Sequence, residues 1–314
     1  MVLLPPYADA TWPEQISAAV PGTQVELLEH PADAMETIAD ADAAYGTVPP
    51  ELLARAGRLR WIAAPLAGLG ESWFYDELVA SDVVVTSMAG IYNEHLAAHA
   101  VGFVLAFARR FDVYLPLQAE RRWRRGQDMI DLPSTVAMIV GVGGSGTEAA
   151  RLCAAFGMYV IGVDPRTPAP PPGMAELVTP ERMDQRLGEA DFVIVTTPET
   201  PQTLGMFDSR RFGLMKQGAY FVNIARGTCA VTDDLVDALR SGHLGGAGLD
   251  VVDPEPLPAD HPLWQTPGVL LTPHVAIAGA PGLPERRGAI LVENCRRFDR
   301  GETLINVVDK ANWY

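Results

Sequence analysis

The chain has 314 residues, of which 48% are hydrophobic and 20% are charged, a composition typical of a folded globular protein. The 39 acidic side chains outweigh the 24 basic ones, and the formal net charge of −15 disfavours binding to nucleic acid phosphates. The most apolar helical stretch, 96–108, is too short to span a membrane. The start of the chain lacks the features of an export signal, and the sparse cysteines fit a reduced, cytoplasmic setting.

The first part of the chain alternates short β-type runs with helical patterns. Strands are predicted at 25–28, 43–45, 60–64 and 83–86. Helices are predicted between them at 13–20, 32–39, 50–56 and 72–80. Such alternation predicts crossover connections and a parallel sheet covered on both faces. Because a chain this long tends to divide its core, we expect two domains, with a long helix from 93 to 110 leading into the second.

The second part contains the clearest buried strand, 135–140, which no charge interrupts and which is therefore expected at the centre of a parallel sheet. Further strands are predicted at 159–163, 192–196, 220–223, 246–250 and 269–272. Helices are predicted at 147–156, 208–215 and 232–239. The proline-rich stretch 167–173 is interpreted as a rigid surface loop. Four arginines around Trp123 are interpreted as a solvated helix face: Arg121, Arg122, Arg124 and Arg125.

A glycine-rich segment, 141–146, follows the central strand directly and reads G-x-G-x-x-G. Gly141 permits a tight turn, Gly143 lets a pyrophosphate approach the backbone, and Gly146 allows the next helix to pack closely on the strand. The helix start supplies N–H groups and a positive dipole end to phosphates. The segment therefore predicts a dinucleotide-binding site.

Asp164 ends the next strand, where it is expected to accept hydrogen bonds from the adenosine ribose hydroxyls. A carboxylate at this place would repel a 2′-phosphate, which favours NAD over NADP. Arg166, two residues later, leaves NADP open, because its guanidinium would bind that phosphate if it turned toward it.

Polar residues follow the later strands of the second domain. Arg226 comes after the strand at 220–223, Asp250 and Glu255 after the strand at 246–250, and His274 after the strand at 269–272. Ligands bind beyond the carboxyl ends of the strands in such sheets. We therefore expect a cation, a carboxylate and an imidazole to gather where a nicotinamide would lie.

Taken together, these motifs resemble the D-isomer-specific 2-hydroxyacid dehydrogenase family, and the resemblance covers nearly all of the chain. The closing stretch, 293–298 with 306–308, is similar to the subgroup that contains glyoxylate/hydroxypyruvate reductase. The motifs that carry the family resemblance are the glycine segment with Asp164, Thr197-Pro198 through Thr203, Asn223-Ile224-Ala225-Arg226-Gly227, Leu249-Asp250-Val251 with Glu255-Pro256-Leu257, and Pro262-Leu263-Trp264 with Thr272-Pro273-His274.

The resemblance implies roles for three catalytic residues. Arg226 would bind the substrate carboxylate in a bidentate manner and polarise the 2-oxo group. His274 would give a proton to the carbonyl oxygen during reduction and take it back during oxidation, and Glu255 would fix the imidazole tautomer.

Further residues are assigned by the same resemblance. Backbone N–H groups of the loop at Ala67, Gly68 and Leu69 would meet the substrate carboxylate, and Asp250 would accept from the nicotinamide carboxamide. No metal is implied. The full set implied or predicted to bind the cofactor is Gly141, Gly143, Gly144, Ser145, Gly146, Asp164, Thr197, Pro198, Thr203, Ile224, Ala225 and Asp250.

The implied fold is α/β, with a Rossmann-type cofactor domain inserted into a flavodoxin-like substrate domain, each a doubly wound parallel sheet. The substrate domain would comprise 1–92 and 278–314, and the NAD-binding domain 93–277. The cleft between them would close on the substrate. A homodimer through the cofactor domain is expected.

The implied reaction is hydride transfer between NAD(H) and a small 2-oxo or D-2-hydroxy acid of the glyoxylate or hydroxypyruvate type. Two alternatives stay open: a nucleotide-sensing protein without catalysis, and a dehydrogenase of the same family for another reductant such as phosphite. Ser145 departs from the family pattern, which usually has a bulky aliphatic residue there.

Overall fold

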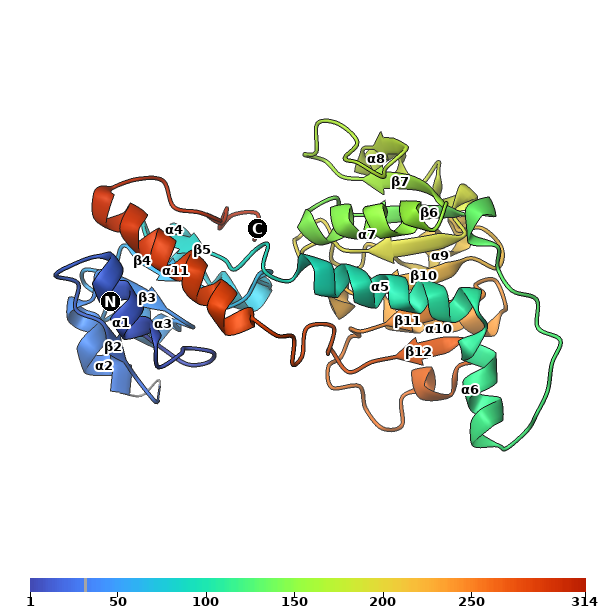
Figure 1. The fold of residues 1–314 in the computed structure, drawn as a ribbon, viewed down its shortest axis with the longest axis horizontal. Coiled ribbons are helices and arrows are strands. Elements are labelled where there is room, and N and C mark those ends of the chain that lie inside the picture. The colour runs from blue at the N-terminus through green and yellow to red at the C-terminus, as the bar shows by residue number, and fades with distance from the viewer. Residues whose placement is uncertain (31–32) are drawn as a thin grey trace. The chain divides into compact units, whose positions relative to one another are not determined.

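The computed structural model describes residues 1–30 and 33–314, which form two compact units (Figure 1). One unit comprises Met1–Ile91 and Ala280–Tyr314, and the other comprises Tyr92–Gly279. Each contains a parallel sheet with helices on both faces, so the predicted fold class is confirmed. Within the described ranges, no helix combines the length and apolar character needed to cross a bilayer.

The first unit has a 5-stranded sheet in the order β2-β1-β3-β4-β5, the flavodoxin-like arrangement. Its strands are β1 (Val2–Leu3), β2 (Glu26–Leu27), β3 (Ala43–Tyr45), β4 (Trp61–Ala63) and β5 (Val84–Thr86). Its helices are α1 (Trp12–Ala19), α2 (Ala34–Thr37), η2 (Ile38–Asp40), α3 (Pro50–Leu53), η3 (Glu71–Trp73), α4 (Asp76–Ala80) and α11 (Leu283–Arg300).

Alternate residues of these short strands face opposite layers, because side chains alternate across a sheet. Ile62 packs with α2, α3 and α4 on one face. On the other face Tyr45 meets Trp12 of α1 edge-on at 5.0 Å, and Trp61 meets Phe298 of α11 at 5.5 Å. The C-terminal helix therefore completes the core of the N-terminal unit.

The second unit has a 7-stranded sheet in the order β12-β11-β10-β9-β6-β7-β8. Its strands are β6 (Val136–Val140), β7 (Tyr159–Val163), β8 (Glu176–Val178), β9 (Phe192–Val195), β10 (Tyr220–Asn223), β11 (Gly246–Leu249) and β12 (Val269–Leu271). Its helices are α5 (Asn93–Ala108), α6 (Phe111–Ala119), η4 (Leu132–Ser134), α7 (Gly144–Ala155), α8 (Pro180–Met183), η5 (Leu187–Glu189), α9 (Ser209–Leu214), η6 (Gly227–Cys229), α10 (Thr232–Arg240) and η7 (Pro262–Gln265).

The central strand β6 is buried on both faces, as its unbroken apolar sequence predicts. Ala137 and Ile139 pack with α5 and α7 on one face, whereas Met138 and Val140 pack with α8, α9 and α10 on the other. The strand order reverses at β6, which lies between β7 and β9. Ligands bind beyond the carboxyl ends of strands at such a switch point, and the glycine segment begins there.

Several elements were absent from the predictions. The helix α11 buries Arg287 and Asn294 together with Leu291, so polar residues interrupt its apolar period. No apolar residue of α6 is buried, so burial imposes no apolar pattern on its sequence. The strand β1 is only 2 residues long, and β8 and α8 are a 3-residue edge strand and a 4-residue helix.

Two predicted features need correction. The predicted solvated helix face around Trp123 is wrong, because α6 ends at Ala119 and Arg121 has a φ of +58°, which starts an exposed loop. The helix after the glycine segment starts at Gly144 rather than at 147. The predicted helix at 32–39 is observed as α2 and η2, and Ala32 lies outside the described residues.

Candidate active site

The glycine segment connects β6 to α7, and close contacts require glycine at positions 141 and 146. Gly141 has a φ of +96°, and a Cβ atom there would lie 2.8 Å from the Thr197 nitrogen. A Cβ atom on Gly146 would lie 2.0 Å from the Gly141 oxygen. These two glycines therefore bring strand, helix and the Thr197 loop together, as predicted for a dinucleotide turn.

Gly143 differs from its neighbours because space surrounds it. Apart from the adjoining backbone, no atom of the described residues comes within 4 Å of a Cβ atom placed on Gly143. This residue is the N-cap of α7, whose first-turn N–H groups lack intrahelical partners as at every helix start. Backbone donors beside an open space suit a pyrophosphate, so the residues of this turn fit a dinucleotide cofactor.

Gly144 and Ser145 lie in the first turn of α7 and contact Asn93, the first residue of α5. The Ser145 hydroxyl lies 3.4 Å from Asn93 Oδ1, and a Cβ atom on Gly144 would collide with the Asn93 side chain. The absence of a side chain at 144 therefore allows α5 to begin against the glycine turn.

Asp164 is 7% exposed and holds two backbone segments, one in the glycine segment and one just after β7. Its Oδ2 accepts from the Val142 N–H at 2.9 Å, and its Oδ1 accepts from the N–H groups of Arg166 and Thr167 at 2.8 and 2.9 Å. Burial disfavours the charged carboxylate, but these N–H groups outweigh that effect and lower the pKa of Asp164. The acid therefore has a structural function that its sequence position did not reveal.

The loop after β9 folds back on itself. The Thr203 hydroxyl donates to the Pro198 oxygen at 2.8 Å and accepts from the Thr200 N–H at 2.8 Å. Thr197 lies beside Cys229, whose thiol is buried, and burial raises the pKa of Cys229. The structure thus brings this loop against the segment that follows β10.

Arg226 directly follows two buried residues, Ile224 and Ala225, at the carboxyl end of β10. Asn223, which is 1% exposed, fixes this turn: its amide donates to the Arg226 oxygen at 2.8 Å and accepts from the Ala225 N–H at 3.0 Å. One Arg226 guanidinium nitrogen donates to the Ala225 oxygen at 2.7 Å. Asn223 is therefore a supporting residue that the sequence-based site did not include.

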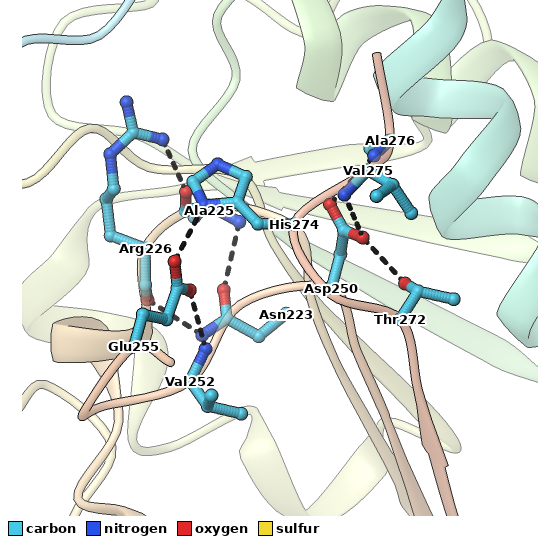
Figure 2. A network of polar contacts seen from close by, with 10 residues as sticks. All are labelled: Asn223, Ala225, Arg226, Asp250, Val252, Glu255, Thr272, His274, Val275 and Ala276. Carbon is cyan, nitrogen blue, oxygen red and sulfur yellow. Dashed lines mark hydrogen bonds and ion pairs between the residues drawn. The ribbon is translucent and has the colours of Figure 1, made fainter. Parts of the chain in front are cut away.

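Gly227 allows the Arg226 turn to approach the loop that carries Glu255. A Cβ atom on Gly227 would lie 1.9 Å from the Val252 oxygen. The Val252 N–H in turn donates to Glu255 Oε1 at 3.0 Å. The second carboxylate oxygen, Oε2, lies 2.8 Å from His274 Nδ1 (Figure 2). Three separate strand ends thus contribute to one group of side chains.

The His274–Glu255 contact determines which imidazole nitrogen is available for proton exchange with a ligand. Because an ionised carboxylate only accepts hydrogen bonds, Nδ1 carries a proton and donates a hydrogen bond to Glu255. This leaves Nε2 as the nitrogen for proton exchange with a substrate. The side chains are 49% and 36% exposed, so the pair is accessible to a ligand.

Asp250 directly follows β11 and is 2% exposed. Its carboxylate accepts from the Val275 and Ala276 N–H groups and from the Thr272 hydroxyl (Figure 2). The residue implied as a cofactor ligand thus also holds the turn that carries His274.

The loop at Ala67, Gly68 and Leu69 follows β4 in the first unit. Leu69 is 2% exposed and belongs to the core of that unit. Its side chain is therefore committed to packing, and any ligand contact at this position falls to the backbone.

Comparisons with known proteins agree with this fold. Residues 101–276 match the family model for the D-isomer specific 2-hydroxyacid dehydrogenase, NAD binding domain. A glyoxylate/hydroxypyruvate reductase A from Serratia proteamaculans is 33% identical over 310 residues, which cover 95% of this chain and 94% of that protein.

Two solved structures are similar over the whole chain. A D-isomer specific 2-hydroxyacid dehydrogenase from Xanthobacter autotrophicus Py2, in complex with NADPH and MES, is 30% identical with a TM-score of 0.84, covering 100% and 99% of the two chains. An NADPH-dependent glyoxylate/hydroxypyruvate reductase from Sinorhizobium meliloti, in complex with NADP and sulfate, is 28% identical with a TM-score of 0.83 and the same coverage.

The fold and the strand-end residues define a nicotinamide-dinucleotide oxidoreductase. The chain belongs to the D-isomer-specific 2-hydroxyacid dehydrogenase family, as the sequence motifs implied.

Proposed function

We propose that the protein reduces a small 2-oxo acid of the glyoxylate or hydroxypyruvate type to its D-2-hydroxy acid with NADH. The observation that carries this proposal is the contact of 2.8 Å between His274 Nδ1 and Glu255, on loops adjoining the Arg226 turn. An oriented imidazole beside a guanidinium is the pair needed to bind a carboxylate and protonate a carbonyl. The similarity to glyoxylate/hydroxypyruvate reductases supports the substrate class.

In this proposal the three side chains have separate tasks. Arg226 binds the substrate carboxylate and polarises the 2-oxo oxygen, and His274 Nε2 delivers a proton to that oxygen. Glu255 accepts a hydrogen bond from the Nδ1–H group throughout and stabilises the positive charge of the imidazolium that precedes transfer. The backbone N–H groups of Ala67, Gly68 and Leu69 contribute to carboxylate binding. In the reverse direction His274 takes the hydroxyl proton.

The cofactor supplies the hydride when it is bound, and the chain supplies its binding groups. We propose that Gly141, Gly143, Gly144, Ser145 and Gly146 bind the pyrophosphate and Asp164 the adenosine ribose. The nicotinamide side is assigned to Thr197, Pro198, Thr203, Ile224, Ala225 and Asp250. The acid at 164 supports NADH, whereas Arg166 beside it and the NADP(H) complexes of similar proteins keep NADPH as the alternative.

We further propose that the second unit, about 93–277, is the NAD-binding domain and that 1–92 with 278–314 form the substrate domain. A homodimer through the NAD-binding domain is proposed, because α6 exposes Phe111 and Leu115 by 51% and 54% in that unit. A cytoplasmic location stays a prediction from the cysteine usage.

A panel of 2-oxo acids assayed with NADH and NADPH tests the proposal directly. We expect turnover with glyoxylate or hydroxypyruvate and a higher kcat/KM with NADH. Tight NADH binding without turnover of any acid would favour a nucleotide-sensing protein. Turnover only in the oxidative direction with phosphite would identify a different reductant. Either outcome would refute the proposed reaction.

A further inference from the structure

His274 holds a backbone conformation that few residues other than glycine adopt, with a φ of +53°. Asp250 makes several of the hydrogen bonds that hold this backbone conformation. The Asp250 backbone oxygen accepts from the His274 N–H at 2.7 Å, and its carboxylate accepts from the N–H groups of Val275 and Ala276 at 2.9 and 3.0 Å (Figure 2). Such conformations persist where the surroundings over-determine them. Asp250 therefore clamps the turn at 274–276.

The clamp is itself supported by two side chains. The Thr272 hydroxyl donates to Asp250 Oδ1 at 2.6 Å, and His99 Nε2 lies 2.9 Å from the same hydroxyl oxygen and 3.4 Å from Oδ1. Thr272 has one hydroxyl proton, which the contact with the carboxylate uses, so its oxygen accepts from His99. The His99 proton is therefore on Nε2, and the imidazole acts as a donor.

Close packing of α5 on β11 places His99 at this position. His99 and Phe103 lie one helical turn apart and meet edge-on at 5.0 Å. A Cβ atom on Gly248 would lie 2.5 Å from Phe103 Cγ, so the glycine allows the helix to approach the strand. Asp250 lies two residues beyond Gly248, so both positions face the same side of the sheet. His99 consequently reaches the end of β11 from a separate element.

We propose that His99 is a positioning residue for the reaction. Through Thr272 and Asp250 it holds the turn at 274–276 and so keeps the His274 imidazole in its working orientation. This inference rests on the proposed function, and it assigns a role in turnover to a side chain on α5, outside the strand-end loops. A side chain that only stabilised the fold would change the melting temperature without changing the kcat of folded protein.

The test compares two variants in which His99 is replaced by amide side chains of different length. In His99→Gln the side-chain nitrogen extends about as far as Nε2 of histidine, whereas in His99→Asn it is too short to reach Thr272. His243→Leu is the matched control, because this histidine of the same unit also makes a hydrogen bond, from Nε2 to the Met215 oxygen at 3.0 Å. Each variant is examined by steady-state kinetics and by hydrogen–deuterium exchange of peptides covering 272–278.

For His99→Asn we expect kcat to fall about tenfold to a hundredfold, with the NADH KM within about twofold of wild type. We also expect the Val275 and Ala276 amides to exchange about tenfold faster. His99→Gln should restore most of both properties, and His243→Leu should leave both unchanged.

Three results would overturn the inference: unchanged exchange at 275–276 in His99→Asn, faster exchange with an unchanged kcat, or no recovery in His99→Gln. Failure of the wild type to reduce any 2-oxo acid would refute the proposed function instead. The exchange measurements do not depend on turnover, so they would still decide whether His99 holds the turn.

Discussion

At the scale of single residues, the proposed reaction depends most on His274. His274→Ala removes the proton donor while the glycine turn stays intact, so we expect kcat to fall by about 10²–10⁴-fold. The dissociation constant for NADH, measured by nicotinamide fluorescence, should stay within about threefold of wild type, since the dinucleotide-binding groups are unchanged. Turnover equal to that of the wild type would remove His274 from the mechanism.

In the proposed reaction, Arg226 acts through the planar shape of its guanidinium group as well as through its charge. In Arg226→Lys the ammonium keeps the positive charge but cannot form the parallel pair of hydrogen bonds that a guanidinium makes with a carboxylate. A lost charged hydrogen bond is worth about 1.5–3 kcal/mol, so we expect kcat/KM for the 2-oxo acid to fall about tenfold to a hundredfold. Steady-state kinetics measures this loss, and an unchanged kcat/KM would contradict bidentate binding.

Asp164 is predicted to set the preference between NADH and NADPH. Asp164→Ala removes the negative charge that would face a 2′-phosphate, so we expect the ratio of kcat/KM for NADPH to that for NADH to rise about tenfold. Arg166→Ala should change the ratio in the opposite direction if its guanidinium binds the phosphate. Ratios that stay the same in both variants would place cofactor selection at other residues.

The sequence predicted which candidate side chains lie at neighbouring strand ends better than it predicted the contacts that hold them. Arg226, Glu255 and His274 follow strands whose carboxyl ends share one edge, so strand prediction was enough to group them. The roles of Asn223, Thr272 and the bonds of Asp164 depend on how loops fold back toward strand ends. Some of these contacts span only two or three residues, as those of Asn223 do, and others join residues 22 positions apart, such as Thr272 with Asp250; neither kind leaves a periodic signal.

At the scale of elements, the contact between α5 and β11 is set by a glycine. Gly248→Ala would force a Cβ atom to 2.5 Å from Phe103 Cγ, and we expect such overpacking to cost about 1–3 kcal/mol of unfolding free energy. Gly102→Ala on α5 is the matched control: among the described residues no atom lies within 4 Å of the added Cβ atom. This control should stabilise by about 0.5–1 kcal/mol.

Urea unfolding of both variants measures these changes, and a Gly248→Ala protein as stable as wild type would contradict the packing argument.

Elements whose hydrophobic residues follow a regular period were predictable from the sequence. The strand β6 is buried on both faces, and the helix α5 buries one continuous stripe of residues. The helix α11 was not predictable, because it buries an arginine and an asparagine among apolar residues. Burial of polar groups is decided by tertiary contacts that sequence patterns do not encode.

At the scale of the whole molecule, the surface of the second unit predicts self-association. Phe111 and Leu115 of α6 are exposed by 51% and 54%, and the following loop exposes Trp123 by 92% among four arginines. Large exposed apolar groups that lie together mark interaction sites, and a basic loop complements a second copy of a chain whose net charge is −15. These features favour the proposed homodimer over a monomer.

Light scattering after size-exclusion chromatography tests the dimer. We expect the wild type to have twice the chain mass of 33.8 kDa. The double variant Phe111→Glu, Leu115→Glu should have the mass of one chain, because the two substitutions in each of two chains would bury four carboxylates without partners at the interface. Phe156→Glu is the control, since this aromatic side chain of the same unit is 42% exposed on a different helix end, and it should remain dimeric. A double variant that keeps twice the chain mass would place the interface on another surface, and a wild-type monomer would refute the dimer itself.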